Sequence, residues 1–407
     1  MNAEIKAPLE GLRVVDMTRA LAGPYVTMML ADLGAEVIKV EPLSGDFTRS
    51  QGPFHPTDDV HSFGGYFASV NRNKSSIACD LRTEEGQQIV RDLVKGSDVL
   101  VENFRARVMD KMNLGFEPLL KLNPKLVYGT VRGFGDPRTG SSPYTDRPAL
   151  DVVAQAMGGI MSITGRPGGP PTKIGPGVGD IFPASLVVIG ILAALRRVES
   201  TGVGEFVDVA MYDSIISLCE RTVYQHSYLG AVPGREGNDH PIFCPFGLYE
   251  AADGWVSIAA PVDHHWATLC KVIGHPELAT DPGFAKNTAR VSKRDQVRDY
   301  IEEWSRKHTL AEVEAALSNL VPVAPVNTVD RIFEDPHVSA REMLIELEQP
   351  GVETPLAVAG QPIKFAAGNR TDMRRAQHLG ESTDEVLREI GYTQERVQSL
   401  KDQGLVY

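Results

Sequence analysis

Short apolar runs alternate with amphipathic segments through the first half of the chain. The segments between the runs, such as Thr83–Lys95, have the spacing of helices. Apolar strands separated by helices predict a parallel sheet covered on both faces, which is a large Rossmann-like, doubly wound α/β domain. The predicted strands are Leu12–Met17, Ala35–Glu41, Ser76–Leu81, Asp98–Glu102, Leu126–Arg132 and Glu205–Met211.

The pattern changes after a predicted helix from Tyr212 to Leu229. Residues 247–252 and 255–260 alternate in polarity and are joined by Asp253-Gly254, which predicts a β-hairpin. Three helices are expected to follow, at His264–Ile273, Lys293–Lys307 and Leu310–Leu320. This region predicts a second, smaller α/β domain.

Composition narrows the class of protein. The chain has 407 residues and a formal net charge of −12, which argues against a nucleic-acid surface. Its four cysteines are far apart in the sequence and lack metal-ligand spacing, so we expect free thiols, no metal site and a cytoplasmic location. The apolar stretch 181–195 is expected to be too short to span a membrane.

The first strand-to-helix turn excludes one common role for such a sheet. Residues 16–24 read DMTRALAGP and lack the glycine fingerprint of dinucleotide-binding domains. Two other short motifs are candidate ligand contacts. Residues 71–75 (NRNKS) are either a solvated loop or a phosphate-binding segment. Residues 102–105 (ENFR), followed by basic residues and a methionine, suit an adenine ring and its phosphates.

Asp180 is the residue of greatest chemical interest. It ends the turn Gly175–Asp180, directly before an apolar helix expected at 181–195. A carboxylate there is either the N-cap of the helix or a nucleophile that attacks a thioester. The residues of this stretch alone favour the cap.

Seven segments in order resemble the class III CoA-transferases, the family of formyl-CoA and carnitine CoA-transferases that also includes alpha-methylacyl-CoA racemase. They are GLRVVDMTRALAGPYVTMMLADLGAEVIKVEP, NRNKSSIACDL, DVLVENFRARVMDKMNLG, LVYGTVRGFG, DVVAQAMGGIMSITG, GDIFPASLVVIGILAAL and GVGEFVDVAMYDS, spanning residues 11–214. The resemblance implies an interlocked homodimer. It also implies a large CoA-binding domain from residues 1–225, a linker and small domain from 226–330, and a C-terminal segment, 331–407, that returns to the large domain.

The resemblance implies an activity as well. Asp180 aligns with the family's catalytic aspartate, which forms an aspartyl anhydride with the donor acyl group and then an aspartyl-CoA thioester. The implied function is an acyl-CoA:carboxylate CoA-transferase, with acyl-CoA and a carboxylic acid as substrates and no permanently bound cofactor. We expect the helix dipole to keep Asp180 ionised for attack.

Family contacts to CoA carry over to eleven positions. Leu21 stands where formyl-CoA transferase has glutamine, which suggests a less polar acyl pocket. Lys111 replaces an arginine and keeps its charge. The implied CoA contacts are Ala20, Leu21, Ala22, Asn73, Lys74, Ser75, Asn103, Phe104, Lys111, Met112 and Arg147.

Two alternatives remain open at this stage. One is a 2-methylacyl-CoA racemase or epimerase, although the racemases have a His-Asp pair where this chain has Leu150-Asp151, and leucine transfers no proton. The other is a CoA-binding protein without turnover. Residues 235–241 also lack the glycine run that forms a lid in formyl-CoA transferase. His240 and Arg235 in this loop are candidates for holding an acid, and Arg19, Arg147 and Arg235 favour one with a second carboxylate.

Overall fold

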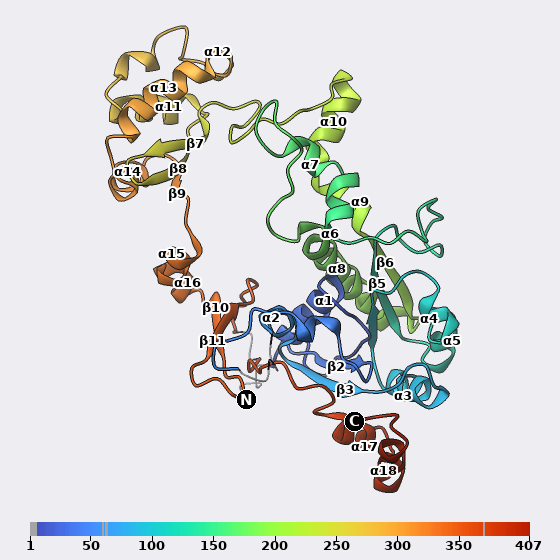
Figure 1. Cartoon of the computed structure of the whole chain (residues 1–407). Helices are drawn as coiled ribbons and strands as arrows, with labels where there is room; N and C mark the ends of the chain where they lie inside the picture. The colour runs from blue at the N-terminus through green and yellow to red at the C-terminus, as the bar shows by residue number, and fades with distance from the viewer. Residues whose placement is uncertain (1–5, 59–60, 62–63, 369–370) are drawn as a thin grey trace. The chain divides into compact units, whose positions relative to one another are not determined.

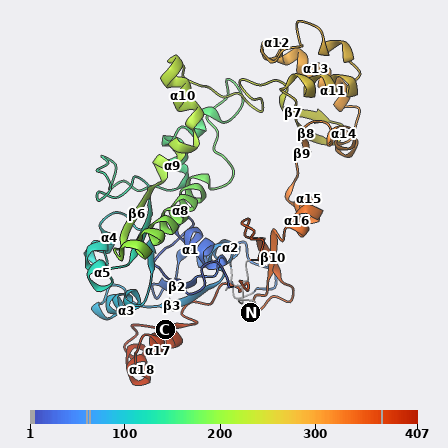
Figure 2. The same ribbon diagram turned by 180° about the vertical axis from the view of Figure 1, so that it is seen from behind.

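The computed structural model describes residues 6–58, 61, 64–368 and 371–407. Its ribbon is shown in Figures 1 and 2. The chain divides into two compact units, which we call the large unit and the small unit. The large unit comprises residues 1–160, 174–224 and 339–407, and the small unit comprises 161–173 and 225–338. Nothing in the hydrophobic pattern distinguishes residues 161–173 from the chain on either side.

A six-stranded parallel sheet forms the centre of the large unit. The strand order is β3-β2-β1-β4-β5-β6, and every neighbouring pair is parallel. This confirms the predicted doubly wound α/β fold. The order reverses direction between β1 and β4, and ligands of such sheets bind beyond the carboxyl ends of the strands at this point. The strands are β1 (Arg13–Asp16), β2 (Glu36–Glu41), β3 (Lys74–Ala78), β4 (Val99–Glu102), β5 (Val127–Arg132) and β6 (Glu205–Ala210).

Helices cover both faces of this sheet, as Figure 1 shows. On one face α1 (Ala22–Asp32) and α8 (Val178–Thr201) pack against each other and on the strands. On the other face α3 (Glu84–Lys95) and α5 (Phe116–Leu122) share an apolar core with the sheet and with the C-terminal helices. The remaining helices up to residue 163 are short: η1 (Phe47–Ser50), α2 (Gly65–Asn71), α4 (Val108–Lys111), α6 (Asp151–Met157) and α7 (Ile160–Ile163).

The C-terminal segment covers the outer edge of the sheet. The hydroxyl of Thr383, at the start of α17 (Thr383–Glu389), accepts the N–H of Ala78, and the N–H of Asp80 donates to the carbonyl of Leu405. These bonds, with α18 (Gln394–Asp402), blunt an edge strand that would otherwise expose unpaired backbone groups. Upstream, β10 (Leu344–Leu347) pairs with β11 (Leu356–Ala359), a strand that the sequence pattern did not predict.

Helix α8 is longer than the sequence pattern indicated. It begins three residues before the expected start and continues to Thr201, so it has 24 residues rather than the 15 of 181–195. By length and composition α8 is therefore able to cross a membrane, which corrects the expectation that it is too short. Helices in the core of a protein can have the same length and apolar composition as a membrane span. Val187, Val188 and Ile191 of α8 are buried.

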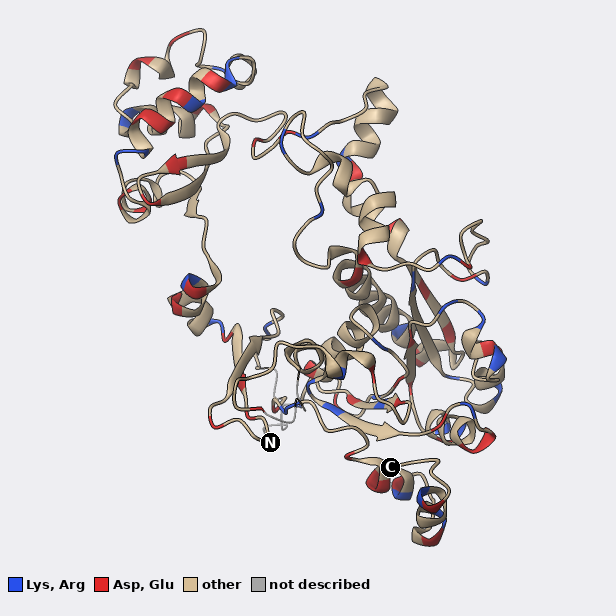
Figure 3. Ribbon diagram, in the orientation of Figure 1, with Lys and Arg blue, Asp and Glu red and all other residues tan. Residues whose placement is uncertain are grey.

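The helix expected from Tyr212 to Leu229 is broken at Cys219. It forms α9 (Met211–Leu218) and α10 (Glu220–Leu229). None of the ten residues of α10 is buried, and its Tyr228 is 85% exposed. Figure 3 shows few charged residues along α8, α9 and α10, so this helical run presents largely uncharged surface.

The small unit contains the predicted hairpin. Strands β7 (Phe246–Ala251) and β8 (Gly254–Ala259) pair antiparallel around the turn Ala252-Asp253, one residue earlier than the predicted Asp253-Gly254, and β9 (Val323–Pro325) adds a third strand. A core centred on the fully buried Trp266 joins this sheet to its helices. The helices are α11 (Asp263–Val272), η2 (Pro276–Ala279), α12 (Asn287–Ser292), α13 (Arg294–Ser305), α14 (Leu310–Leu317) and α15 (Val329–Glu334). Helix α16 (Pro336–Ala340) spans the junction with the large unit.

Candidate active site

The first candidate contact is the turn that links β1 to α1, and it is fixed to the end of β4. Asn103 accepts the N–H of Arg19 at 2.9 Å and donates to the carbonyl of Arg19 at 2.8 Å. A Cβ on Gly23 would lie 2.8 Å from Cγ of Asn103, so the close approach of α1 to β4 requires glycine. The structure thus brings Ala20, Leu21, Ala22 and Asn103 together at the topological switch point of the sheet.

Buried charges beneath this turn hold it in place. Ala20 has a φ of 68°, a strained value for a residue other than glycine, and its N–H donates to Asp46 at 3.1 Å. Lys39 donates to the carbonyl of Thr18 at 2.8 Å and lies 3.5 Å from Asp46. We call Asp16, Lys39, Asp46 and Lys74 the buried ion cluster, because Lys74 in turn lies 3.0 Å from Asp16 and all four are buried.

Asn73 and Lys74 differ from the solvated cation-rich loop that the sequence allowed. The ammonium group of Lys74 has three protein partners, the carbonyl of Pro24, Oδ1 of Asn71 and the carboxylate of Asp16. Asn73 is bonded to Asp32 and to the backbone of Arg374. Their side chains therefore stabilise the turn and the C-terminal segment, whereas Ser75 remains partly exposed.

The backbone of Phe104 is fixed by a buried ion pair. Glu102 pairs with Arg132 and accepts the N–H of Phe104 at 2.7 Å, while Arg132 donates to the carbonyl of Phe104. The guanidinium of Arg19 lies 5.1 Å from the centre of the Phe104 ring, which leaves an aromatic face and a cation beside the turn. Lys111 is exposed at the end of the neighbouring α4, and Met112 is partly buried against the core.

Arg147 lines a cavity of about 450 Å³ in the large unit. Arg107 lies on its other side, and Asp146 lies 4.0 Å from Arg107. Three prolines and two serines complete much of the wall. Two exposed arginines at one cavity suit a phosphate group.

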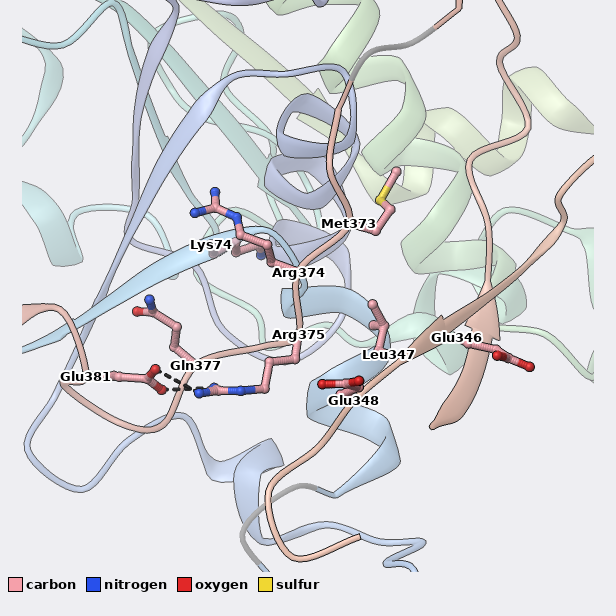
Figure 4. Close-up of a pocket in the computed structure, with 9 residues that line it drawn as sticks. All are labelled: Lys74, Glu346, Leu347, Glu348, Met373, Arg374, Arg375, Gln377 and Glu381. Atoms are coloured by element: carbon pink, nitrogen blue, oxygen red, sulfur yellow. Dashed lines mark hydrogen bonds and ion pairs between the residues drawn. The ribbon is translucent and has the colours of Figure 1, made fainter. Parts of the chain in front are cut away.

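A second cavity, of about 440 Å³, lies between β10 and the segment 373–381 (Figure 4). Its most prominent cation, Arg375, forms an ion pair with Glu381 across the cavity, and two further glutamates line it. Of the predicted CoA contacts it includes Lys74 alone, and the Lys74 ammonium is engaged by Asp16. Three cations (Lys74, Arg374 and Arg375) and three glutamates line this cavity, and two of the cations are already paired with carboxylates. Because it holds only one of the predicted CoA contacts, we do not assign it to CoA.

Asp180 occupies the first turn of α8, three residues after the N-cap. The N-cap is Gly177, and the Asp180 carboxylate makes no capping bond, so the interpretation of Asp180 as the cap is wrong. A Cβ on Gly177 would lie 3.1 Å from Cδ2 of Leu21 and 3.9 Å from Oδ2 of Asp180. Leu21 and Asp180 therefore both border Gly177, and the side chain of Leu21 supplies an apolar wall to the site.

The electrostatics of Asp180 also correct the sequence-based expectation. Burial, together with the negative charge of Asp151, raises its pKa to about 7. The dipole of α8 therefore does not keep Asp180 fully ionised, because desolvation and a like charge outweigh it. A carboxylate of raised pKa is more basic than ordinary aspartate, and this favours nucleophilic attack once it is ionised.

Two residues near Asp180 were missed by sequence reasoning. Burial, and then the negative charge of Asp180, raise the pKa of Tyr66, so the two groups interact electrostatically. Gln155 bonds both oxygens of Asp151. Of these two residues, only Gln155 could have been found from the sequence, because it lies four residues after Asp151 on one helix, where side chains are neighbours.

Leu150 and the loop 235–241 complete the predicted set. Leu150 precedes α6 and is 68% exposed, and its side chain offers no acid or base. In the small unit the loop is tied to α13, because Arg298 pairs with Asp239 at 2.6 Å and Arg294 donates to the carbonyl of His240. Arg235 donates to the carbonyl of Ser162.

The fold defines a doubly wound α/β protein whose switch point suits a ligand, and comparison with known proteins identifies the family. Residues 9–383 match the model of CoA-transferase family III, so the chain belongs to that family. The protein is an enzyme that transfers CoA from an acyl-CoA to a carboxylic acid. CoA thioesters are accordingly substrates of this enzyme.

Similar proteins span nearly the whole chain. A succinyl-CoA:mesaconate CoA-transferase of Haloarcula hispanica is 48% identical and aligns over 94% of this chain and 96% of its own. A succinate–glutarate CoA-transferase of Agrobacterium fabrum is 38% identical over 95% and 96% of the two chains. A crystal structure of a CAIB/BAIF family protein from Brucella suis is 37% identical, with a TM-score of 0.83 over 94% of this chain and 99% of that one.

Proposed function

We propose that the enzyme transfers CoA through covalent intermediates on Asp180. The observation that carries this proposal is the environment of that carboxylate: it is partly buried at the first turn of a helix, and its pKa is raised to about 7. Within the described residues the structure shows no cation paired with Asp180 and no hydrogen-bond donor to its carboxylate. A carboxylate without such partners keeps its lone pairs available for attack.

The steps balance without water or a net proton change. An oxygen of Asp180 attacks the thioester carbonyl, the C–S bond breaks, and an aspartyl anhydride and the CoA thiolate form. The thiolate attacks the aspartyl carbonyl and releases the donor acid, which leaves an aspartyl-CoA thioester. The acceptor carboxylate then attacks this thioester, and the released thiolate attacks the acceptor's acyl carbonyl to regenerate Asp180. The partial positive charge at the N-terminus of the α8 dipole is proposed to stabilise the oxyanion of each step.

CoA is proposed to lie over the carboxyl ends of β1 and β4. The turn Ala20–Ala22 and the face of Phe104 border the site, with Ser75, Lys111 and Met112 at its margin and Arg147 at a phosphate. Asn73, Lys74 and Asn103 act there by fixing the backbone of the turn. This division between contact and support follows from which side chains are already bonded within the protein.

The donor is proposed to be succinyl-CoA and the acceptor a C4 or C5 dicarboxylic acid. The names of the relatives from Haloarcula hispanica and Agrobacterium fabrum support this choice. Arg19 supports it too, since its exposed guanidinium lies beside the Leu21 turn and suits a second carboxylate. Assays with succinyl-CoA and a panel of mono- and dicarboxylic acids test this, and a preference for monocarboxylic acids would refute it.

A homodimer and a cytoplasmic location are also proposed. The exposed apolar residues Ile189 on α8 and Val223 on α10, both in the large unit, support a surface covered by a second copy. The four buried free cysteines support a reducing compartment. A light-scattering mass near 44.3 kDa, that of one chain, would contradict the dimer.

The role of Asp180 is tested by Asp180→Asn, which keeps the shape of the side chain but removes the nucleophilic oxygen pair. We expect the transfer rate to fall by at least about 10³-fold, while binding of CoA changes little. Asp213→Asn is the matched control, because burial also raises the pKa of that carboxyl on α9. Retention of most activity in Asp180→Asn would refute the proposal.

A further inference from the structure

One buried side chain holds both ends of the turn that carries Asp180. Gln155 lies on α6 and is 0% exposed. Its Oε1 accepts the N–H of Ile174 at 3.0 Å. Its Nε2 donates to Oδ1 and Oδ2 of Asp151 at 2.9 and 3.0 Å. Both hydrogen-bonding ends of the amide are therefore engaged within the protein.

Asp151 passes this restraint on to the nucleophile. Its Oδ1 accepts the N–H of Gly179, the residue before Asp180, at 2.8 Å. A Cβ on Gly179 would lie 2.6 Å from the carbonyl oxygen of Asp151 and 3.0 Å from Oδ1, so the two backbones are in close contact. Hydrogen bonds along the path Ile174–Gln155–Asp151–Gly179 therefore connect the two ends of the turn.

The turn needs such a restraint because of its composition. Residues 174–179 read IGPGVG, and three of the six are glycines, which lose the most conformational freedom when they are ordered. Asp180 must reach the thioester carbonyl from a defined direction, and a misplacement of about 1 Å costs about 10²-fold in rate. Fixing the turn is therefore a requirement of the chemistry as well as of the fold.

We propose that Gln155 is a positioning residue for the Asp180 nucleophile, acting through the Asp151 carboxylate and the backbone of Gly179. The inference rests on the proposed function, because it takes Asp180 as the attacking group. Gln155 is buried and touches neither substrate, so its loss should lower kcat and leave KM for the CoA ester nearly unchanged.

An exchange of the two groups tests this path. In Gln155→Glu the carboxylate at position 155 faces the carboxylate of Asp151, and the two repel each other. In Asp151→Asn the new amide keeps its oxygen toward the N–H of Gly179, so its N–H₂ group faces the N–H₂ group of Gln155. In the double variant the new amide at position 151 donates to the new carboxylate at position 155. The second oxygen of that carboxylate still accepts the N–H of Ile174, so all three links of the path are restored, with one amide-to-carboxylate bond where the wild type has two.

We expect each single variant to lower kcat by about 30- to 100-fold with KM within about threefold, and the double variant to recover to within about fivefold of the wild type. Gln155→Asn keeps both functional groups on a shorter stem and is expected to lower kcat about tenfold with little change in melting temperature. If Gln155→Glu or Asp151→Asn does not fold, the kcat of Gln155→Asn tests the positioning role instead.

Gln88→Glu is the matched control. Gln88 on α3 also donates to an aspartate four residues away, Asp92, and accepts from Arg91, but it lies on a helix that carries no part of the site. Its kcat should equal that of the wild type. The inference is overturned if Gln155→Asn keeps the wild-type kcat, or if a folded double variant stays as slow as the singles.

Asp180→Asn is assayed in parallel to separate the two proposals. If it is active, the proposed function fails. If it is inactive while the Gln155 variants keep the wild-type kcat, only the positioning role fails.

Discussion

Two aspartates of the large unit, Asp16 and Asp180, have opposite electrostatic environments. Burial tends to raise the pKa of Asp16, but Lys74, Lys39 and two threonine hydroxyls outweigh it and lower the pKa to about 2. Burial also acts on Asp180, and the nearby Asp151 adds to it, so that pKa rises to about 7. A structural carboxylate is surrounded by partners, whereas a reactive one is deprived of them.

The contacts of Asp16 explain this contrast. Thr27 donates to Asp16 at 2.6 Å, and the Lys74 ammonium lies at 3.0 Å. The turn above is thereby held in a strained conformation with Ala20 at positive φ. The proposed site therefore combines an ionised, buried cluster beneath the turn with a carboxylate that changes its protonation near neutral pH.

Breaking the buried ion cluster should have the largest effect on stability. Asp16→Asn leaves Lys74 and Lys39 buried without their counter-charge, and we expect a loss of about 3–5 kcal/mol in the free energy of unfolding. The measurement is urea unfolding at pH 7. Because the pKa of Asp16 is lowered, its contribution is fully present there and is lost only as the pH falls through about 2.

Asp80→Asn is the control for that loss. Asp80 pairs with Arg82, whose side chain is 87% exposed, and such a surface pair contributes about 1 kcal/mol or less. Equal losses of unfolding free energy in Asp16→Asn and Asp80→Asn would show that the buried ion cluster stabilises the protein no more than a surface ion pair does.

The pH dependence of activity should report Asp180. With a pKa of about 7, the carboxylate is increasingly protonated below that pH, and kcat/KM should fall about 50-fold between pH 7 and pH 5. Asp16 stays ionised over this range, so the buried ion cluster is unchanged and circular dichroism should be constant. An acidic limb centred near pH 4 would contradict the raised pKa.

Asp180→Asn should stabilise the free protein at alkaline pH. A carboxyl whose folded pKa exceeds its unfolded value destabilises the fold once the pH rises above the unfolded pKa of 3.8, up to the full amount above about 7. Since Asp180 is only partly buried, we expect a gain of about 1–3 kcal/mol at pH 8. The gain should vanish at pH 4, where the wild-type residue is protonated. A loss of stability at pH 8 would contradict this reasoning.

Asn103→Ala should give the smallest of these effects. It removes both bonds to the backbone of Arg19, and we expect CoA-ester affinity to weaken about tenfold with kcat within about threefold. Calorimetric titration measures this. Asn287→Ala in the small unit, which removes a comparable bond to the backbone of Cys244, should leave the affinity unchanged.

The sheet and the hairpin were predictable because their sequence patterns are strong and local. Strands β9 and β11 escaped prediction because both are short and contain or follow a proline, and β9 pairs with a strand more than sixty residues earlier in the chain. The position of Asp180 in its motif singles it out as the proposed nucleophile. The direction of its pKa shift was not predictable, since it comes from burial and from Asp151, 29 residues away in sequence. The sequence likewise did not reveal the partner of Lys74. Its positive charge suits a phosphate, but in the structure it is paired with Asp16 inside the fold.

Trapping the intermediate tests the central claim most directly. The enzyme is mixed with succinyl-CoA, quenched with hydroxylamine, digested and examined by mass spectrometry. We predict a hydroxamate on Asp180, formed from the anhydride or the aspartyl-CoA thioester, and none on Asp16 or in Asp180→Asn. Efficient CoA transfer by an enzyme that shows no adduct on Asp180 would contradict the account.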